Sequence, residues 1–355
     1  MAIEDFGAQT KGLDVSVLWA DHRNSPDFAA EKAREWYDKD GVDAIFDVPN
    51  SAVALAVSEI TQKANKVFID SGAATSDLTG ALCSPNTLHW TYDTWELAHG
   101  TGSAVLKAGG TSWFFLTVDY VFGYTLERDT SAVVTEEGGA VLGDVKFIRN
   151  TPDISSYVLE AQRSGAKVIG LASSGGDTIN AVKEAAEFGI VEGGQKLAGL
   201  LVFITDVHAL GLKTAQGLLL TSPFYWDFNA GTRAWSDRFM QETGGRPTMV
   251  QAGVYSSVLH YLKAVQAVGS AKDGLQIVGK MKETPAEDPL FGKSTVRADG
   301  RVIHDSYLFE VKTPAESKGP WDDYKLISTT PAEKAFRPMS EGGCPLVARI
   351  SNKAE

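Results

Sequence analysis

Short apolar runs alternate along the chain with segments whose apolar residues recur at helical spacing. The runs predict strands, and the segments between them predict helices that each cover one face of a sheet. A run that is apolar without interruption, such as 112–118 (SWFFLTV), is typical of a parallel strand covered on both faces. The strands predicted in this way span residues 13–20, 44–48, 67–70, 112–118, 141–148, 168–172, 200–204, 217–221 and 307–311, with a hairpin in 291–305.

This order of strands and helices predicts an α/β protein with parallel sheets. The α/β pattern returns after extended segments near Tyr92 and Thr248, which predicts two lobes that exchange chain more than once. A length of 355 residues is sufficient for two domains of ordinary size. We expect lobe one to comprise residues 1–92 and 249–302, lobe two to comprise 93–248 and 303–340, and 341–355 to form a tail.

Composition narrows the classes of partner. The 33 Lys and Arg residues against 45 Asp and Glu residues give a formal net charge of −12, which repels nucleic acid and anionic membrane surfaces. No run of about 18 apolar residues is present, so no membrane-spanning helix is expected. The first residues, MAIED, lack the basic start and apolar centre of a secretory signal.

Two turns in the stretch 44–78 carry the strongest candidate chemistry. Pro49-Asn50-Ser51 and the segment 71–76 (SGAATS) each follow a predicted parallel strand, and ligands of open α/β sheets bind at the carboxyl ends of the strands. A hydroxyl at Ser51 and free amides at Ala73 and Ala74 would hold a small anion such as a carboxylate. The alternative is that Ser51, Thr75 and Ser76 are only helix caps.

Motifs that would indicate an enzyme are missing from the sequence. It contains no Walker A motif, no G-x-S-x-G elbow and no G-x-G-x-x-G after a predicted strand. The six histidines occur singly, without metal-ligand spacing. The turn 173–178 (SSGGDT) either cradles a phosphate or only makes a tight connection from strand to helix. We therefore expect a protein that is not an enzyme and uses no cofactor or metal.

Cys83 and Cys344 are the two cysteines of the chain. They form one disulfide in an oxidising compartment or remain two inert thiols in a reducing one. Composition does not decide between these states.

Three segments of the sequence resemble a known family. ADHRNSPDFAAEKAREWYDKDGVDAIFDVPNSAVALAVSEI, VFIDSGAATSDLTG and WFFLTVDYVFGYTLERD are similar to the type I periplasmic solute-binding proteins of ABC transporters. The similarity is closest to the branched-chain amino-acid (leucine/isoleucine/valine) binding group and its relatives that bind small aromatic or aliphatic carboxylates. It covers nearly the whole chain and is loose after about Arg297. It implies two Rossmann-like lobes, joined by three crossings, that close on a ligand between them.

The resemblance also implies a set of ligand-binding residues. The carboxylate contacts of the family fall on Ser51, Ala73 and Ala74, with Asn50 and Thr75 adjacent. Its aromatic contacts fall on Phe122, with Tyr120 beside it, and on Tyr255. The acidic residue that holds the ammonium group of an amino acid falls near Asp206. The expected ligand-binding residues are Asn50, Ser51, Ala73, Ala74, Thr75, Tyr120, Phe122, Ser173, Asp206 and Tyr255.

The sequence departs from the family pattern in two places. Ser173-Ser174-Gly175 stands where a tyrosine is expected, which widens the pocket, and aromatic residues such as Tyr225 and Trp226 could stack on a ring. The sequence therefore favours neither an aromatic carboxylate nor an aliphatic amino acid as the ligand. Family members also begin with a strand and a Gly-rich turn before the helix that ends in MAIEDF, so we expect the first strand of lobe one to be missing from this sequence.

Further expectations follow from the resemblance. A periplasmic location implies a Cys83–Cys344 disulfide that ties the tail to lobe one, and two free thiols remain the alternative. The implied function is the substrate-binding component of an ABC importer, which closes about its hinge on a small carboxylate and delivers it to a permease in the inner membrane. The rival function is a ligand-sensing regulator or receptor domain on the same scaffold.

Overall fold

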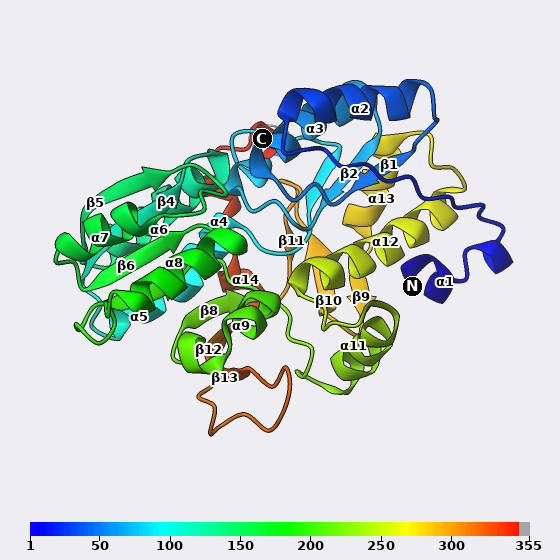
Figure 1. Ribbon diagram of the computed structural model, residues 1–355. Helices are drawn as coiled ribbons and strands as arrows, with labels where there is room; N and C mark the ends of the chain where they lie inside the picture. The colour runs from blue at the N-terminus through cyan, green and yellow to red at the C-terminus, as the bar shows by residue number, and fades with distance from the viewer. Residues whose placement is uncertain (348–355) are drawn as a thin grey trace. The chain divides into compact units, whose positions relative to one another are not determined.

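The computed structural model describes residues 1–347 and divides them into two compact units. Unit one comprises Met1–Tyr92, Val250–His304 and, of the described residues, 336–347. Unit two comprises Asp93–Met249 and Asp305–Ala335. Each unit is therefore built from separate segments of the chain, and each is an α/β structure (Figure 1).

Unit one contains a parallel sheet in the order β1-β2-β3 and a small antiparallel sheet in the order β11-β10-β9. The strands are β1 Ala44–Phe46, β2 Val67–Asp70, β3 Thr87–His89, β9 Ala286–Asp288, β10 Gly292–Val296 and β11 Val302–Ile303. The α-helices are α1 Ala2–Phe6, α2 Pro26–Asp38, α3 Ser51–Lys63, α12 Met249–Val268, whose first residue belongs to unit two, and α13 Gly274–Glu283.

Strand β2 shows how the sequence builds the core of unit one. Its side chains alternate between the two faces of the sheet, as the period of a strand requires. Phe68 packs in one apolar cluster with residues of α2 and α3, whereas Val67 and Ile69 pack in another with residues of α12 and α13. All three are fully buried, so the uninterrupted apolar run reflects a strand with helices on both faces.

Unit two contains a parallel sheet in the order β5-β4-β6-β7 and an antiparallel sheet in the order β13-β12-β8. The strands are β4 Ser112–Val118, β5 Ala140–Phe147, β6 Val168–Ala172, β7 Lys196–Gly199, β8 Leu219–Ser222, β12 Ser306–Val311 and β13 Tyr324–Thr330. The α-helices are α4 Thr94–Leu97, α5 Ser103–Lys107, α6 Val121–Glu136, α7 Ser155–Arg163, α8 Gly176–Glu187, α9 Ile204–Leu210, α10 Leu212–Ala215, α11 Ala230–Thr243 and α14 Ala332–Ala335.

Most of the predicted strands are confirmed. Seven of them correspond within two residues at each end to β1, β2, β4, β5, β6, β8 and β12, and the hairpin predicted in 291–305 corresponds to β10 and β11. Residues 94–107 are helical throughout, with a π-helical turn at Ala98–Gly102 between α4 and α5. A Cβ on Gly100 would overlap the Thr221 side chain of β8, so this turn depends on glycine for its close packing.

The strand predicted over 13–20 is wrong. This segment joins no sheet and runs as coil between α1 and α2 (Figure 1). Val17, Leu18 and Trp19 are 70%, 50% and 88% exposed. An alternating apolar pattern forms a strand only where a neighbouring strand accepts its hydrogen bonds. Within residues 1–347, β1 pairs with β2 and not with this segment.

One further predicted strand is misplaced, and one strand was not predicted. The strand predicted over 200–204 lies earlier, as β7 Lys196–Gly199, because only those residues pair with β6. The apolar residues that follow are buried in the turn and in the start of α9 instead. After Val311, where the sequence pattern predicts no strand, the structure contains β13, which pairs antiparallel with β12. Most of β13 is exposed on one edge of the sheet, so its apolar signal is weak.

The Cys83–Cys344 disulfide is confirmed. The two residues lie 261 positions apart in the sequence, and their Cα atoms are 5.6 Å apart. Both belong to unit one, so the bond ties the end of the described chain to the loop after η2 (Ser76–Thr79). Such a cross-link restricts the unfolded chain over a long loop.

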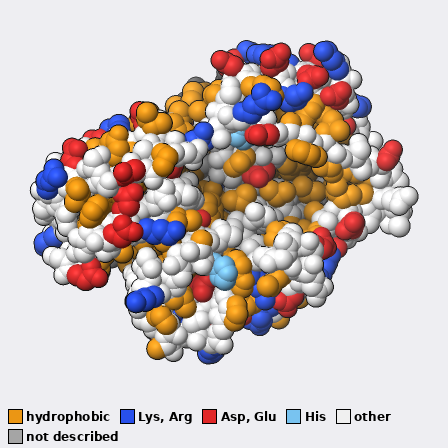
Figure 2. Space-filling model, in the orientation of Figure 1, with side chains coloured by type: hydrophobic (Ala, Val, Ile, Leu, Met, Phe, Trp, Pro, Cys, Tyr) orange, Lys and Arg blue, Asp and Glu red, His pale blue; other side chains and the backbone are white. Residues whose placement is uncertain are grey.

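The face of the molecule seen in Figure 2 carries mixed charge. Figure 2 shows Lys and Arg interspersed with Asp and Glu over the visible face, without a patch of one sign. Among the described helices, none is long and apolar enough to cross a membrane.

We predict that the Cys83→Ser/Cys344→Ser double variant unfolds more easily than the wild type. Because the bond closes a loop of 261 residues, its loss should lower the free energy of unfolding by about 2–5 kcal/mol. Denaturant unfolding with and without a thiol reductant measures this difference. The reductant should destabilise the wild type and leave the double variant unchanged; an equal response of both proteins would contradict the prediction.

Candidate functional site

Two neighbouring turns of unit one form the candidate site. One follows β1 and the other follows β2, and these strands are parallel neighbours, so both turns lie at the same edge of the sheet. The buried carboxylate of Asp70 joins them. Its Oδ1 accepts a hydrogen bond of 2.9 Å from the amide of Val48, and its Oδ2 accepts one of 3.0 Å from the amide of Ala73. The geometry of each turn therefore depends on the other.

The carbonyl groups of the second turn are occupied by side chains from β3 and the segment after it. The Thr91 hydroxyl donates to the carbonyl of Ser71, the Tyr92 hydroxyl donates to that of Gly72 at 2.7 Å, and Nε2 of His89 donates to that of Ala73 at 2.7 Å. Because a buried carbonyl without a partner is costly, these three bonds fix the path of the turn. The turn is thus preorganised rather than a free loop.

Ser51 makes a second connection between the turns. Its Oγ accepts a hydrogen bond of 3.2 Å from the amide of Thr75, which leaves the Ser51 hydroxyl proton to be donated elsewhere. The helix cap of α3 is Asn50, whose Oδ1 accepts from the amides of Ala52 and Val53. The capping alternative therefore does not describe Ser51, which is the first residue of α3.

The groups expected to bind an anion are the Ser51 hydroxyl and the amides of Ala73 and Ala74, and not all of them are available to a ligand. The amide of Ala73 already donates to Asp70. The amide of Ala74 has no protein partner within residues 1–347, although Ala74 is only 2% exposed. Thr75 caps η2, because its hydroxyl accepts from the amide of Asp77. The donors that remain at this edge are the Ser51 hydroxyl and the Ala74 amide.

Asp47 lies in the first turn under unusual constraints. Its backbone adopts a left-handed conformation with a φ of 55°, and its Oδ1 is buried without a hydrogen-bond partner among the described residues. Burial raises the pKa of Asp47 to about 6. A Cβ on Gly72 would lie 2.6 Å from this oxygen, so glycine is required there.

Burial also raises the pKa of Asp70 well above its ordinary value, and the nearby charge of Asp47 adds to this shift. The amides of Val48, Ala73 and Gly72 act in the opposite direction, because they stabilise the charged carboxylate. The two turns therefore surround a pair of carboxyl groups, of which Asp70 is well hydrogen-bonded and Asp47 is not.

Four of the predicted ligand-binding residues lie in unit two, in the turns after its parallel strands or in the first residues of the helices that follow. Tyr120 and Phe122 follow β4, with ring centroids 5.8 Å apart. Burial raises the pKa of Tyr120 to about 12, so its phenol is neutral. Ser173 follows β6 and shares a hydrogen bond of 2.8 Å with the hydroxyl of Thr178.

Asp206, the fourth of these residues, lies in α9 and stabilises backbone turns. Its Oδ2 accepts a hydrogen bond of 2.9 Å from the amide of Phe203, and the amide of Gly175 also donates to this carboxylate. Burial raises its pKa to about 6. Asp206 therefore connects the turn after β6 to the start of α9.

Tyr255 lies in unit one, on α12. Its hydroxyl donates a hydrogen bond of 2.7 Å to Oδ2 of Asp5, at the end of α1. This phenol ties α1 to α12.

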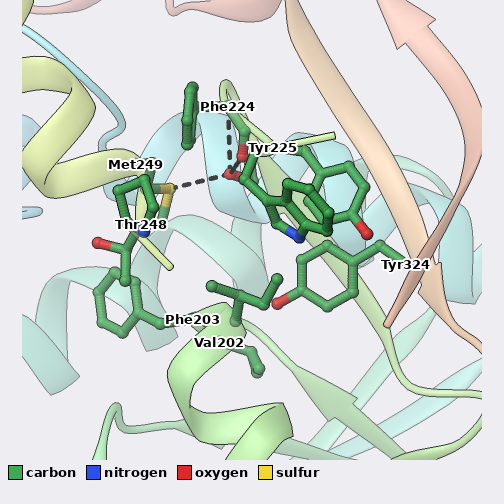
Figure 3. Close-up of a pocket in the computed structure, with 11 residues that line it drawn as sticks. Val202, Phe203, Phe224, Tyr225, Thr248, Met249 and Tyr324 are labelled. Carbon is green, nitrogen blue, oxygen red and sulfur yellow. Dashed lines mark hydrogen bonds between the residues drawn. The ribbon is translucent and has the colours of Figure 1, made fainter. Parts of the chain in front are cut away.

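A pocket in unit two contains residues that the sequence analysis missed (Figure 3). It encloses about 250 Å³, including the part open to solvent. The residues that line it are Val202, Phe203, Ile204, Ser222, Phe224, Tyr225, Trp226, Pro247, Thr248, Met249 and Tyr324. Only Tyr225 and Trp226 were singled out from the sequence. Tyr324 lies in β13, for which the sequence pattern predicts no strand.

Within residues 1–347 no group of three or more His, Cys, Asp or Glu side chains is placed to hold a metal ion. The groups described above are neutral donors, aromatic rings and a few buried carboxyl groups.

Comparisons with known proteins point to one family. A family model described as periplasmic binding protein matches residues 1–320. A crystal structure of a periplasmic binding protein from Burkholderia mallei is 48% identical, with a TM-score of 0.95 over 98% of this chain and 92% of that one. A branched chain amino acid ABC transporter periplasmic ligand-binding protein from Burkholderia xenovorans LB400 is 37% identical, with a TM-score of 0.84 over 97% and 92%. An ABC transporter solute-binding protein from R. palustris, in complex with benzoate, shares the fold at 20% identity, with a TM-score of 0.85 over 97% and 92%.

We predict that Ser51→Ala weakens carboxylate binding more than it weakens the fold. The change removes the donated hydroxyl proton and also the acceptor of the Thr75 amide, so a loss of about 1 kcal/mol of stability is expected as well. Ser25→Ala is the matched control, because Ser25 caps α2 through the amide of Phe28 and should cost a similar amount. Calorimetric titration should show at least tenfold weaker binding for Ser51→Ala alone; equal affinities of the two variants would contradict this.

We predict that Asp47→Asn flattens the pH dependence of stability. A raised carboxyl pKa means that between about pH 4 and pH 6 the folded protein keeps a proton that the unfolded chain releases, so stability falls as pH rises through this window. Asparagine does not titrate and tolerates the left-handed backbone. Relative to the wild type, the variant should gain on the order of 2–3 kcal/mol between pH 4 and pH 7. If the melting temperatures of the wild type and the variant change by the same amount over this pH range, the raised pKa of Asp47 is refuted.

Proposed function

The chain belongs to the periplasmic binding protein family, and on this premise we propose that it is the substrate-binding component of an ABC importer for a small carboxylate, with an aromatic carboxylate as the favoured ligand. Its relatives are substrate-binding proteins of transporters rather than enzymes. The proposed partner is a permease in the inner membrane, and the proposed location is the periplasm. The Cys83–Cys344 disulfide supports an oxidising compartment.

The observation that carries this proposal is the pair of donors at the carboxyl ends of β1 and β2. The Ser51 hydroxyl proton and the Ala74 amide have no protein acceptor within the described part of the chain, while the groups around them are hydrogen-bonded. Asp70 and Ser51 hold the two turns in register, so the donors need no rearrangement when an anion binds. A carboxylate has two acceptor oxygens and matches this pair.

The remaining predicted residues would act in the same capture. We propose that Asn50, Ala73 and Thr75 shape the carboxylate site. Asn50 caps α3, the amide of Ala73 holds its turn against Asp70, and Thr75 caps η2. Tyr120, Phe122 and the turn at Ser173 would cover the ligand when the protein closes about its hinge. Closure is favoured only as far as the ligand binds the closed form more tightly than the open one.

The role of Asp206 favours an aromatic carboxylate over an amino acid. An amino acid needs a carboxylate to balance its ammonium group, and Asp206 was the candidate. Its carboxylate already accepts from the backbone amides of Phe203 and Gly175, so part of its hydrogen-bonding capacity is used within unit two. The pocket of unit two, by contrast, is lined with aromatic rings. Benzoate, the ligand of one relative, is the first compound to test.

The experiment is a thermal-shift screen with benzoate, 4-hydroxybenzoate, leucine and benzamide. Benzamide has the ring of benzoate without its charge and is the matched control. At 100 times the dissociation constant a ligand stabilises the folded protein by about 2.7 kcal/mol, so benzoates should raise the melting temperature by several degrees. Leucine should act more weakly, and benzamide should have no effect. Equal shifts with benzamide and benzoate, or no shift with any carboxylate, would overturn the proposal.

A further inference from the structure

Strand β5 forms an open edge of the parallel sheet in unit two. Within residues 1–347 it pairs with β4 and with no other strand, and Figure 1 shows it at the margin of the sheet. Most of its residues are exposed. Leu142 in the strand and Ile148 directly after it are 51% and 70% exposed, although both are large and apolar. An edge of this kind presents backbone groups to which a further strand can bind.

The backbone of β5 directs two residues toward this open edge. The carbonyl of Phe147 accepts a hydrogen bond of 2.8 Å from the amide of Asp119, directly after β4, so the backbone groups of Phe147 face β4. This orientation alternates along a strand, so the groups of Val145 also face β4, whereas those of Asp144 and Lys146 face outward. The edge therefore offers the N–H and C=O groups of Asp144 and Lys146 to a new partner.

The sequence of this edge is complementary to itself. When two copies of β5 run antiparallel with a two-fold axis at Val145, Asp144 of each copy lies opposite Lys146 of the other, and Leu142 lies opposite Ile148. Asp144 and Lys146 both direct their backbone groups outward, so they form hydrogen-bonded pairs across the axis. Side chains of opposite residues share one face, so a carboxylate meets an ammonium group twice.

Other registers of two copies are unfavourable. A two-fold axis at Asp144 places this carboxylate opposite itself, and an axis at Lys146 does the same to the ammonium group, so like charges meet. An axis between two residues would pair outward backbone groups with groups that face β4. The register at Val145 is therefore the one that satisfies both charge and backbone.

The local structure of β5 permits this pairing. Its register with β4 is irregular at Leu142 but regular from Gly143 to Phe147, which includes the residues on both sides of the proposed axis. Asp144 and Lys146 form an exposed ion pair within one chain, and Nζ of Lys146 lies 3.9 Å from Oε2 of Glu127 on α6. Exchange of this ion pair between two copies keeps each charge balanced, and exposed ion pairs are held only weakly.

We propose that β5 is a self-association surface, through which two copies of this chain pair antiparallel about a two-fold axis at Val145 and join their four-stranded sheets into one. The dimer is isologous, because the same strand serves both copies. The inference goes beyond the proposed function and needs no ligand.

The test is a charge exchange, measured by sedimentation velocity over a range of protein concentrations. The wild type should form a reversible dimer. Asp144→Lys and Lys146→Asp should each weaken association by about tenfold or more, because like charges then lie opposite one another. The double variant Asp144→Lys/Lys146→Asp restores opposite charges and should restore association. Amide hydrogen exchange in residues 140–148 should slow as the wild type dimerises, because the outward amides become bonded.

Glu59→Lys is the matched control. It changes the net charge as much as Asp144→Lys does and breaks an exposed ion pair with Lys63 on α3 of unit one, so it should leave association unchanged. A wild type that remains monomeric, or a dimer that survives both single variants, overturns the inference. A double variant that fails to associate overturns the register on which it rests. These measurements use no ligand, so the proposed function is tested separately.

Discussion

The buried carboxylate of Asp70 is the constraint on which the candidate site depends. It binds the amide of Val48 after β1 and the amide of Ala73 after β2, so two turns that are 20 or more residues apart in the sequence share one anchor. Burying a carboxylate is unfavourable unless it is hydrogen-bonded, and these amides supply the compensation. The Ser51 hydroxyl adds a second link through Thr75. The hydrogen bonds of Asp70 and Ser51 thus fix the position of the Ala74 amide, and neither side chain accepts a hydrogen bond from it.

The sequence predicted the parts of the fold that follow from local pattern. Val67–Asp70 reads as a buried parallel strand because Phe68 and its neighbours pack against helices on opposite faces. Residues 13–20 have an equally good strand pattern, yet pairing depends on a partner that local pattern does not reveal. The strand after β6 was placed too late, because an apolar run also occurs in a buried turn such as Leu200–Val202.

The turns of the candidate site were predictable from the sequence, but their hydrogen bonds were not. The strand-end rule pointed to the turns at Ser51 and Ala73. It gave no sign that Asp70 would occupy the Ala73 amide, or that Asp206 would bind backbone amides. Tyr324 joins the pocket across more than a hundred residues of sequence from Val202, through the pairing of β13 with β12. Contacts of this kind arise from tertiary packing, which a pattern of single residues does not encode.

We propose that the carboxylate of the ligand is held by the Ser51 hydroxyl and the Ala74 amide. A crystal structure of the protein grown with 4-hydroxybenzoate measures this directly. We expect one carboxylate oxygen within about 3 Å of Ser51 Oγ and of Ala74 N, with the Asp70 bonds to Val48 and Ala73 unchanged. A bound ligand whose carboxylate contacts neither group would contradict the account.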